Sequence, residues 1–338
     1  MLDKKVYIGF ITYGENTVKY LPYFLPSISS QSYRYSKLYC VDNSENENNQ
    51  NSQYIKDNFP EIEIYPQKEN LGFAKAFNLM INKAIDKKAD YFLCLNPDMV
   101  FEPDMVEKLV DSINIDEKIG AMMPKILKWD FEKNEKTEIV DSYGLVIDRR
   151  HRFFDDYQGL MDDHEVKKIK DIFGFTGAAV LLNLEAMKDI AYKKEYFDEL
   201  MFMYKEDCDL SYRLRLAGWD IKLISEAVAY HDRTAAIVGQ NMLNVALNRK
   251  NKNKQLKRWS FLNQLILLYK IKNLPFSLAV KINTYYYLIG SIIFAVIFES
   301  YLIKELFKFK KLMSEVEKRS RALKLRVDVK EVERFMKS

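Results

Sequence analysis

Cysteine and histidine are scarce in this sequence, and its first residues contain no long apolar run. The 338 residues include 3 cysteines and 3 histidines. The cysteines are odd in number, and Cys40 and Cys94 lie in apolar runs, which argues against a disulfide framework and predicts a reducing, cytosolic setting. The opening MLDKKVYIGF mixes charges with a short apolar run, which argues against a signal peptide.

The net charge of +4 hides an asymmetry between two parts of the chain. Residues 1–248 carry 31 Lys+Arg and 41 Asp+Glu, whereas residues 249–338 carry 21 Lys+Arg and 7 Asp+Glu. Such asymmetry predicts that the C-terminal part faces an anionic partner, either nucleic acid or the cytoplasmic surface of a membrane. The alternative is that the basic part only neutralises the acidic part. We therefore predict two regions with a boundary after residue 248.

The first 130 residues alternate short apolar runs with helical patterns. Strands are predicted at 6–12, 37–44, 61–66 and 90–98, helices at 17–31, at 72–87 and after Pro103, and a polar loop at 44–53. This alternation predicts an α/β fold with a mostly parallel sheet and helices on both faces. Ligands of such sheets bind at the carboxyl ends of the strands. The candidate site residues are therefore those that follow the strands, such as Thr12, Asp42 and Asn96 to Asp98.

The middle of the chain is charged and irregular before regular patterns resume. We predict a hairpin near 140–147, and we expect His151 and His164 in this segment to be exposed to solvent. Further along, the patterns predict a strand at 174–183, a helix at 206–219 that stops at Gly218, and a strand at 221–231 that ends at a histidine.

Two acidic groups could carry chemistry. Asp98 follows a strand in an Asn-Pro-Asp turn, where a carboxylate beside a diphosphate suits Mg²⁺ or Mn²⁺; the alternative is that Asp98 only shapes the turn. Glu206, Asp207 and Asp209 cluster at a helix start, where one carboxylate could act as a general base; the alternative is a capping cluster. Arg213 lies four residues after Asp209 and could pair with it.

Three further features are weaker when taken alone. His231, at a strand end, could be a metal ligand or a structural histidine. Asp42 could accept a hydrogen bond from a pyrimidine ring. Gly72 and Gly177 permit close approach of the backbone to a ligand, but a helix start and a bulge explain them equally well.

The joint occurrence of these residues is more informative than any one of them. In order, the chain contains FITYG, VDNS, NLGFAKAFN, LNPD, FGFTGAAVLL, FDELMFMYKEDCDLSYRLRLAGW and AVAYH, over about residues 5–232. This set resembles the family 2 glycosyltransferases of the GT-A fold (Rossmann-like), especially the rhamnosyltransferase-like branch. Gly14 and the run 75–77 depart from the family pattern, which affects details of nucleotide contact.

The resemblance implies a role for each matching residue. Nucleotide-sugar contacts are implied for Thr12, Tyr13, Asp42, Asn70, Gly72, Asn78, Asn96 and Gly177. Asp98 and His231 would hold Mg²⁺ or Mn²⁺, with Asn96 in place of the first acid of the family's DxD motif. Asp207 would be the general base, with Glu206 beside it.

The implied function is an inverting, metal-dependent glycosyltransferase. It would move a sugar, with dTDP-rhamnose as the first candidate donor, from a nucleotide diphosphate to a hydroxyl of a glycan or polyprenyl-linked glycan acceptor in cell-surface polysaccharide synthesis. A nucleotidyltransferase that makes sugar nucleotides is one alternative, although residues 9–20 lack the arginine that triphosphate binding favours. A non-catalytic, glycan-binding scaffold is the other.

The C-terminal region has the composition of a membrane-associating segment. Residues 282–298 are seventeen residues without charge, and 304–326 carry nine Lys+Arg against three Glu. This pattern predicts peripheral attachment to the inner face of the cell membrane rather than nucleic-acid binding, with a spanning helix or a protein-packed helix as alternatives. A stripe at Leu302, Leu306, Phe309, Met313, Val316 and Leu323 could also form a homodimer seam.

Overall fold

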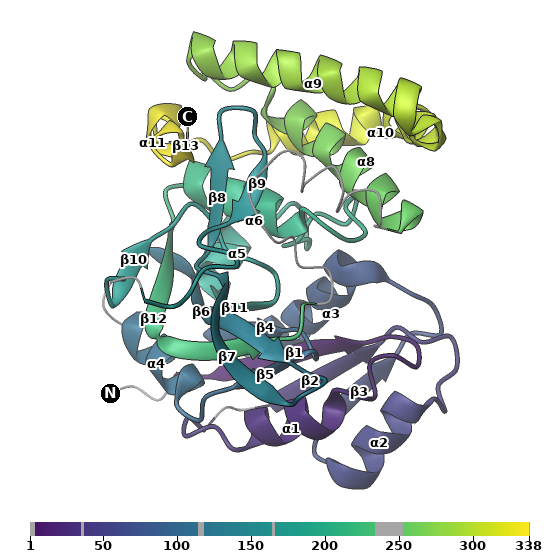
Figure 1. The fold of residues 1–338 in the computed structure, drawn as a ribbon, viewed down its shortest axis with the longest axis vertical. Coiled ribbons are helices and arrows are strands. Elements are labelled where there is room, and N and C mark those ends of the chain that lie inside the picture. Colours follow the sequence, from purple (N-terminus) through teal and green to yellow (C-terminus); the bar gives the residue numbers. More distant parts are fainter. Residues whose placement is uncertain (1–3, 35–36, 114–117, 164–165, 234–252, 338) are drawn as a thin grey trace.

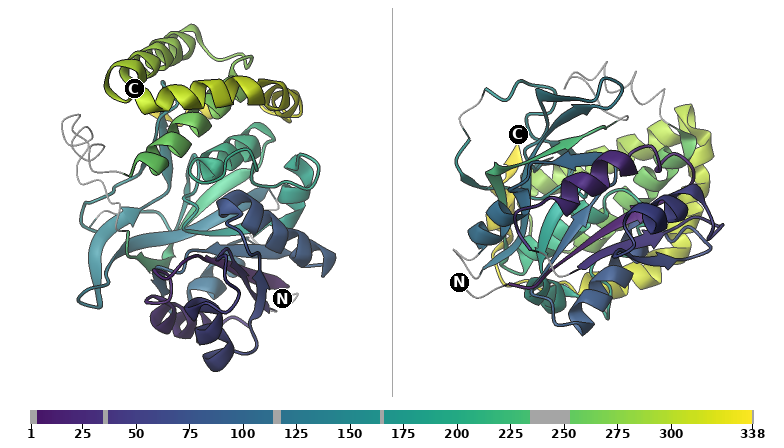
Figure 2. Two further views of the ribbon diagram at one scale, coloured as in Figure 1. Left: turned by 90° about the vertical axis from the view of Figure 1, so that its right-hand side faces the viewer. Right: turned by 90° about the horizontal axis from the view of Figure 1, so that it is seen from below.

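A computed structural model describes residues 4–34, 37–113, 118–163, 166–233 and 253–337. Its centre is a ten-stranded sheet in the order β10-β12-β6-β11-β4-β1-β2-β3, with β5 added on β12 and β7 on β6 (Figure 1). The C-terminal helices form a layer at one end of the molecule, opposite α1 and α2 (Figures 1 and 2).

The N-terminal half of the sheet is parallel, as the sequence predicts. Its elements are β1 (Val6–Thr12), α1 (Leu21–Ser29), β2 (Lys37–Asp42), α2 (Gln50–Asn58), β3 (Glu63–Pro66), α3 (Gly72–Asp86) and β4 (Tyr91–Leu95). The predicted loop at 44–53 is wrong in its second half, where α2 begins. The Asn49 side chain caps this helix by accepting hydrogen bonds from the backbone N–H groups of Asn51 and Ser52.

The second half of the sheet is mixed. Its elements are β5 (Met99–Phe101), α4 (Met105–Ile113), β6 (Ile119–Asp130), β7 (Glu135–Ser142), β10 (Ile169–Asp171), β11 (Ala179–Asn183), α5 (Leu184–Ile190), α6 (Glu206–Leu216) and β12 (Asp220–His231). β11 runs antiparallel to both β4 and β6, whereas β12 runs parallel to β6. The α/β class with a mostly parallel sheet is confirmed, with antiparallel strands that the sequence did not reveal.

The predicted hairpin at 140–147 is wrong. β7 pairs with β6 in the main sheet, while β8 (Leu145–Asp148) pairs with β9 (Phe153–Asp155) and β13 (Met336–Lys337) in a separate three-stranded sheet. The chain passes from one sheet to the other at Gly144, whose φ of 102° favours glycine. The hairpin is therefore formed one strand later, by β8 and β9.

Residues after 253 form helices that pack on the remainder of the chain. They are α8 (Lys254–Ile271), α9 (Leu278–Phe298), η1 (Ser300–Leu302), α10 (Ile303–Arg321) and α11 (Val329–Glu333). Leu262 and Ile266 of α8 share a buried apolar cluster with Tyr212 of α6 and Ile147 of β8. Val316, from the stripe on α10, belongs to the same cluster, so a homodimer seam through this stripe would have to displace a contact within the chain.

Candidate active site

A cleft of 590 Å³ lies at the carboxyl ends of β1 and β4 and at the end of β12. Nine of the predicted site residues line it: Tyr13, Asn70, Gly72, Asn96, Asp98, Gly177, Glu206, Asp207 and His231. The fold thus gathers residues from distant parts of the sequence around one cavity. Its size is typical of small-molecule sites, which span roughly 300–1,000 Å³.

Thr12 and Asp42 lie beneath this cleft rather than in its wall. Both are buried, and the Asp42 carboxylate accepts hydrogen bonds from Thr12 Oγ1 at 3.0 Å, from the Ser44 backbone N–H at 3.1 Å and from Ser52 Oγ at 2.6 Å. Asn43 lines the cleft instead, and its amide donates to the Gly72 carbonyl at 3.2 Å. Asp42 therefore holds the ends of β1 and β2 together.

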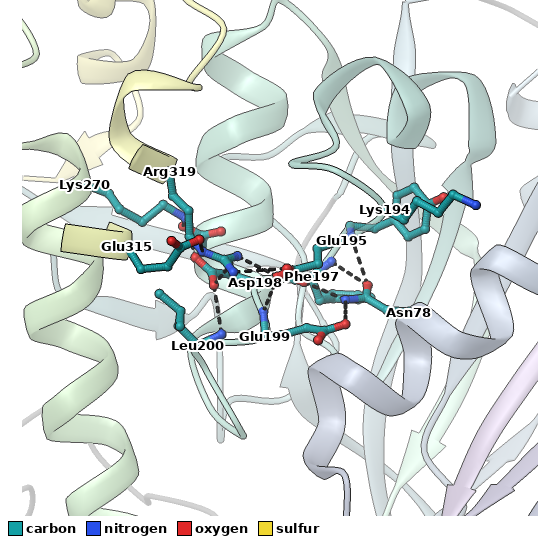
Figure 3. Close-up of polar contacts among 12 residues, drawn as sticks. Asn78, Lys194, Glu195, Phe197, Asp198, Glu199, Leu200, Lys270, Glu315 and Arg319 are labelled. Carbon is teal, nitrogen blue, oxygen red and sulfur yellow. Dashed lines mark hydrogen bonds and ion pairs between the residues drawn. The ribbon is translucent and has the colours of Figure 1, made fainter. Parts of the chain in front are cut away.

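Asn78 also lies away from the cleft, buried on α3. Its Oδ1 accepts from the backbone N–H groups of Tyr196 at 3.0 Å and Phe197 at 2.9 Å, and its Nδ2 donates to the Phe197 carbonyl at 2.8 Å (Figure 3). Asn78 therefore links α3 to the backbone of the segment that leads to α6.

Asp98 and His231 come together through the pairing of β5 with β12. Met99 lies opposite His231 in the antiparallel register, so Asp98 projects beside the imidazole, with Nε2 3.3 Å from the Asp98 Oδ1. On the other side, Nδ1 lies 2.9 Å from the Oδ2 of Asp141. Asp141 occupies a register shift between β6 and β7, and such bulges re-aim side chains.

The two carboxylates decide the charge of His231. Burial alone would lower the pKa of this imidazole, but Asp98 and Asp141 outweigh burial and raise the pKa to about 10. Without a bound cation, His231 is therefore protonated at neutral pH and bridges the two acids. No local sequence pattern indicates Asp141, which lies 90 residues away from His231 along the chain.

The donor set fits a divalent cation held partly by substrate. Among the described residues there is no group of three metal-ligating side chains. Two adjacent ligands of an octahedral ion at ~2.1 Å would be about 3 Å apart, close to the observed 3.3 Å between Asp98 and His231. Asp141 behind the imidazole matches the carboxylate–histidine arrangement that orients ligands in metal sites. The remaining ligands would be oxygens of a diphosphate or water.

The start of α6 presents two carboxyl groups of different character. Asp207 is half-buried in the cleft wall, where its Oδ2 accepts from the Gly177 N–H at 3.1 Å and its Oδ1 from the Cys208 N–H at 2.7 Å. Glu206 is buried, and burial together with the nearby Asp207 raises its pKa well above the usual range. The neutral form is therefore favoured at Glu206, while Asp207 presents its carboxyl group to the cleft.

The turn before α6 is strained, and a C-terminal helix holds it. Tyr204 and Lys205 have φ values of 72° and 70°, a left-handed conformation that costs roughly 1–2 kcal/mol per residue. Asn263 of α8 is buried and donates from Nδ2 to the carbonyls of Met203 at 2.9 Å and Tyr204 at 2.7 Å. Asn263, which the sequence analysis missed, thus fixes the backbone that leads directly into Asp207.

A buried charge network makes a second connection between the same regions. Lys270 of α8 contacts Asp198 at 2.8 Å and also Asp209 of α6, while Arg319 of α10 contacts Asp198 at 2.9 Å (Figure 3). The predicted pair of Asp209 and Arg213 is confirmed, at 2.8 Å, although it is buried rather than exposed. Burial would raise the pKa of Asp198, but Lys270 and Arg319 lower it below the usual value.

Arg233 is another cleft residue that the sequence analysis missed. Its guanidinium lies 2.6 Å from Asp155 Oδ2 and 3.5 Å from Asp141 Oδ1. It follows His231 by two residues on the same strand end, which was the signal that could have indicated it. Through Asp141, it belongs to the same charge cluster as the histidine.

Comparison with known proteins agrees with this geometry. Residues 7–169 match the model of glycosyl transferase family 2. The chain carries a family 2 glycosyltransferase domain. The predicted family resemblance and the predicted enzyme class, a glycosyltransferase, are thereby confirmed.

Individual relatives of this glycosyltransferase are distant. One is N-acetylglucosaminyl-diphospho-decaprenol L-rhamnosyltransferase of Mycobacterium tuberculosis, 23% identical over 229 residues that cover 63% of this chain and 72% of the relative. A crystal structure of GalNAc-T7 with UDP, GalNAc and Mn²⁺ matches with a TM-score of 0.54 at 14% identity, over 84% of this chain. The mannosyltransferase PcManGT of Pyrobaculum calidifontis with GDP-Man and Mn²⁺ matches with a TM-score of 0.50 at 13% identity, over 94% of this chain and 85% of that one.

These structural likenesses show the fold. The chain spans 54% of the length of the GalNAc-T7 chain. The predicted GT-A fold is confirmed.

Proposed function

We propose that this glycosyltransferase moves a sugar from a nucleotide diphosphate to a hydroxyl of a lipid-linked glycan, with inversion at the anomeric carbon. The observation that carries the proposal is Asp207, a carboxylate in the cleft wall that two backbone N–H groups hold in place. The name of the Mycobacterium tuberculosis relative supports rhamnose as the sugar and a polyprenyl diphosphate-linked acceptor, so dTDP-rhamnose remains the first candidate donor.

Asp207 would act as the general base. The acceptor hydroxyl is a poor nucleophile until its proton is removed, and a positioned carboxylate removes that proton as the bond to the sugar forms. Burial and the nearby Asp207 raise the pKa of Glu206, which favours the neutral form of this group and makes it a poor second, nucleophilic carboxylate. A single displacement with one base inverts the anomeric carbon, in contrast to the two carboxylates of retaining glycosidases.

Asp98 and His231 would hold Mg²⁺ or Mn²⁺ at the diphosphate. The cation would supply Lewis-acid stabilisation of the negative charge that develops on the leaving group. Tyr13, Asn70, Gly72, Asn96 and Gly177 would contact the nucleotide sugar directly. Thr12, Asp42 and Asn78 would support that site from beneath.

Gly72 has a structural requirement of its own in this site. Its φ is 73°, and an added Cβ would lie 2.3 Å from the Phe202 carbonyl oxygen, so no other residue fits without movement. The same carbonyl accepts the Phe73 N–H at 2.8 Å. The start of α3 and the loop before α6 therefore meet at the cleft, on backbone atoms.

The exposed face of α9 supports peripheral membrane attachment. This helix has 21 residues, is largely unburied, and is long and apolar enough to cross a membrane. Its exposed side chains include Leu278, Tyr285, Tyr286, Ile293, Ile297 and Phe298. Val280 and Ala295 pack inward, so a helix that lies on the membrane keeps contacts that a spanning helix would lose.

We place the active site on the inner, cytoplasmic side of the cell membrane. In this arrangement residues 1–248 bind the nucleotide sugar and residues 249–338 bring the enzyme to its lipid-linked acceptor, as in cell-surface polysaccharide synthesis. The basic α10 beside α9 would contact anionic lipid, and nucleic acid is not a partner. A homodimer would need a surface other than the α10 stripe.

A thermal-shift panel tests the donor. The melting temperature is measured with dTDP-rhamnose, UDP-hexoses and GDP-mannose, each with Mg²⁺, with Mn²⁺ or with a chelator, and a true donor stabilises the fold by mass action. The expected result is stabilisation by one class of nucleotide sugar that is lost with the chelator and in Asp98→Asn. Stabilisation by a nucleoside triphosphate plus a sugar phosphate, but by no nucleotide sugar, would instead favour a nucleotidyltransferase.

A further inference from the structure

A second cavity lies between the C-terminal helices and shares no lining residue with the catalytic cleft. Its volume is 400 Å³, within the range of about 300–1,000 Å³ that ligand pockets occupy. Its wall is mainly apolar, with contributions from Leu265, Leu268, Phe276, Val280, Leu288 and Phe309. We call this space the helical-layer cavity.

The charged groups at the helical-layer cavity are all cationic. Lys272 and Lys281 line it, and no Asp or Glu does. Lys272 is engaged with Glu317 at 3.1 Å, whereas Lys281 makes no ion pair with another residue that the structure describes. His151, also in the lining, stays neutral because burial lowers its pKa to about 4. A matching ligand therefore has an apolar body and one anionic end.

The outer wall of this cavity is the helix that we expect to face lipid. Val280 on the inner side of α9 is 2% exposed and lines the cavity, while Tyr286 and Ile297 on the outer side are 71% and 64% exposed. A helix that is apolar on all sides belongs in a protein core or in lipid. α9 lies at the outer edge of the molecule (Figures 1 and 2), so lipid could reach the cavity around it.

The β8–β9 hairpin brings the two cavities close to one another. His151, between the strands, lines the helical-layer cavity, and Phe153, at the start of β9, lines the catalytic cleft. Two residues of chain span at most about 7 Å. A single elongated molecule could therefore occupy both spaces around this hairpin.

We propose that the helical-layer cavity binds the polyprenyl chain of the acceptor lipid, with Lys281 on the side of its phosphate groups. The identity of the lipid rests on the proposed function. The polyprenyl chain would enter the cavity from the membrane beside α9. The sugar-bearing end of the lipid would then extend around the β8–β9 hairpin toward Asp207.

The test measures binding of a polyprenyl monophosphate in detergent micelles to the full chain, with polyprenol of equal length and inorganic phosphate as comparison ligands. Val280→Trp fills the cavity, and Val296→Trp makes the same change on the outer face of α9, where the side chain is 50% exposed. We expect Val280→Trp to weaken binding by about tenfold or more, a loss of roughly 1.4 kcal/mol, and Val296→Trp to leave it unchanged. Lys281→Gln should weaken binding of the phosphate but not of the alcohol.

Equal affinities in the two tryptophan variants would overturn the proposal, as would binding of inorganic phosphate as tight as that of the polyprenyl phosphate. Retained stabilisation of Val280→Trp by the sugar donor shows that this variant is folded. If Val280→Trp does not fold, the wild-type protein is instead labelled with a photoreactive polyprenyl phosphate. Labels within 265–288 support the proposal, and labels confined to 293–298 contradict it. Failure of the donor panel, by contrast, refutes the proposed function and leaves this binding result standing.

Discussion

One buried histidine lies in the catalytic cleft and another lies in the β8–β9 turn against the C-terminal helical layer, and the two imidazoles are held in opposite charge states. His231 in the cleft is 4% exposed and lies between Asp98 and Asp141, which raise its pKa to about 10. His151 in the β8–β9 turn is 1% exposed, contacts the Tyr212 hydroxyl, and has its pKa lowered by burial to about 4. Equal burial thus has opposite results, because the neighbouring carboxylates decide the charge.

The same contrast holds for the two regions as a whole. The cleft collects charges that can bind a cation and a diphosphate, whereas the helical layer encloses an apolar cavity with lysines in its lining. The two regions are nevertheless connected. Asn263 and Lys270, both from α8, hold the strained turn and the helix that present Asp207.

The largest expected effect comes from breaking that connection. Lys270→Met removes the cation that Asp198 and Asp209 share and leaves them only Arg319 and Arg213 as partners. Breaking a buried ion pair in this way costs up to about 3–5 kcal/mol in the free energy of unfolding. Lys272→Met is the matched control, because Lys272 is exposed at the C-terminal cap of the same helix and its pair with Glu317 is worth under about 1 kcal/mol. Chemical denaturation measures the free energy of unfolding of both variants. Equal losses of stability in Lys270→Met and Lys272→Met would refute the role of Lys270.

The two histidines should give opposite pH dependences to stability in metal-free protein. His231 has a folded pKa above its ordinary value of 6.5, so its contribution is complete below pH 6.5 and is lost as the pH rises toward about 10. His151 has a lowered pKa, so its contribution is complete above pH 6.5 and is lost as the pH falls toward about 4.

Single substitutions separate these two contributions. Relative to wild type, His151→Gln should remove up to about 3 kcal/mol of the stability change between pH 6.5 and 4, and His231→Gln should flatten the change between pH 6.5 and 10. Unfolding curves across the pH range measure both slopes. If His151→Gln keeps the wild-type slope in acid, the imidazole is not neutral in the folded protein.

A smaller effect is expected behind the metal site. Asp141→Asn keeps a hydrogen-bond acceptor near His231 but removes the charge, and loss of such a carboxylate typically weakens metal affinity or activity by about 10–100-fold. Asp156→Asn, on a carboxylate that contacts Lys170 and Lys337 instead, is the control. Titration of the donor-bound enzyme with Mn²⁺ measures the affinity, and unchanged affinity in Asp141→Asn would remove the imidazole from the metal site.

Helices and strands that have strong local patterns could be predicted from the sequence. Short apolar runs identified β1, β2 and β4, and the glycine stop of α6 was confirmed by the φ of 87° at Gly218. β5 was missed because three residues after a proline turn carry no periodicity. Yet its pairing with β12 is what brings Asp98 to His231.

The site residues that directly follow strands could be predicted from the sequence. Site residues that depend on contacts between distant parts of the sequence could not. Nine predicted residues line the cleft, but Asp141, Asn263 and Lys270 reach their partners from 59 or more residues away. The expectation that His151 is exposed to solvent is wrong, because Gln264 and Phe276 from the C-terminal helices and the loop after α8 cover it. His164 lies outside the described residues.

The most direct test of this account concerns Asp207. Release of nucleoside diphosphate in the presence of donor, acceptor lipid and Mg²⁺ or Mn²⁺ is measured for wild type, for Asp207→Asn and for Asp57→Asn, a control on the exposed face of α2. We expect Asp207→Asn to lose about 10²–10⁴-fold in rate while it still binds the donor, and Asp57→Asn to match wild type. Full activity in Asp207→Asn would contradict the assignment of Asp207 as the base.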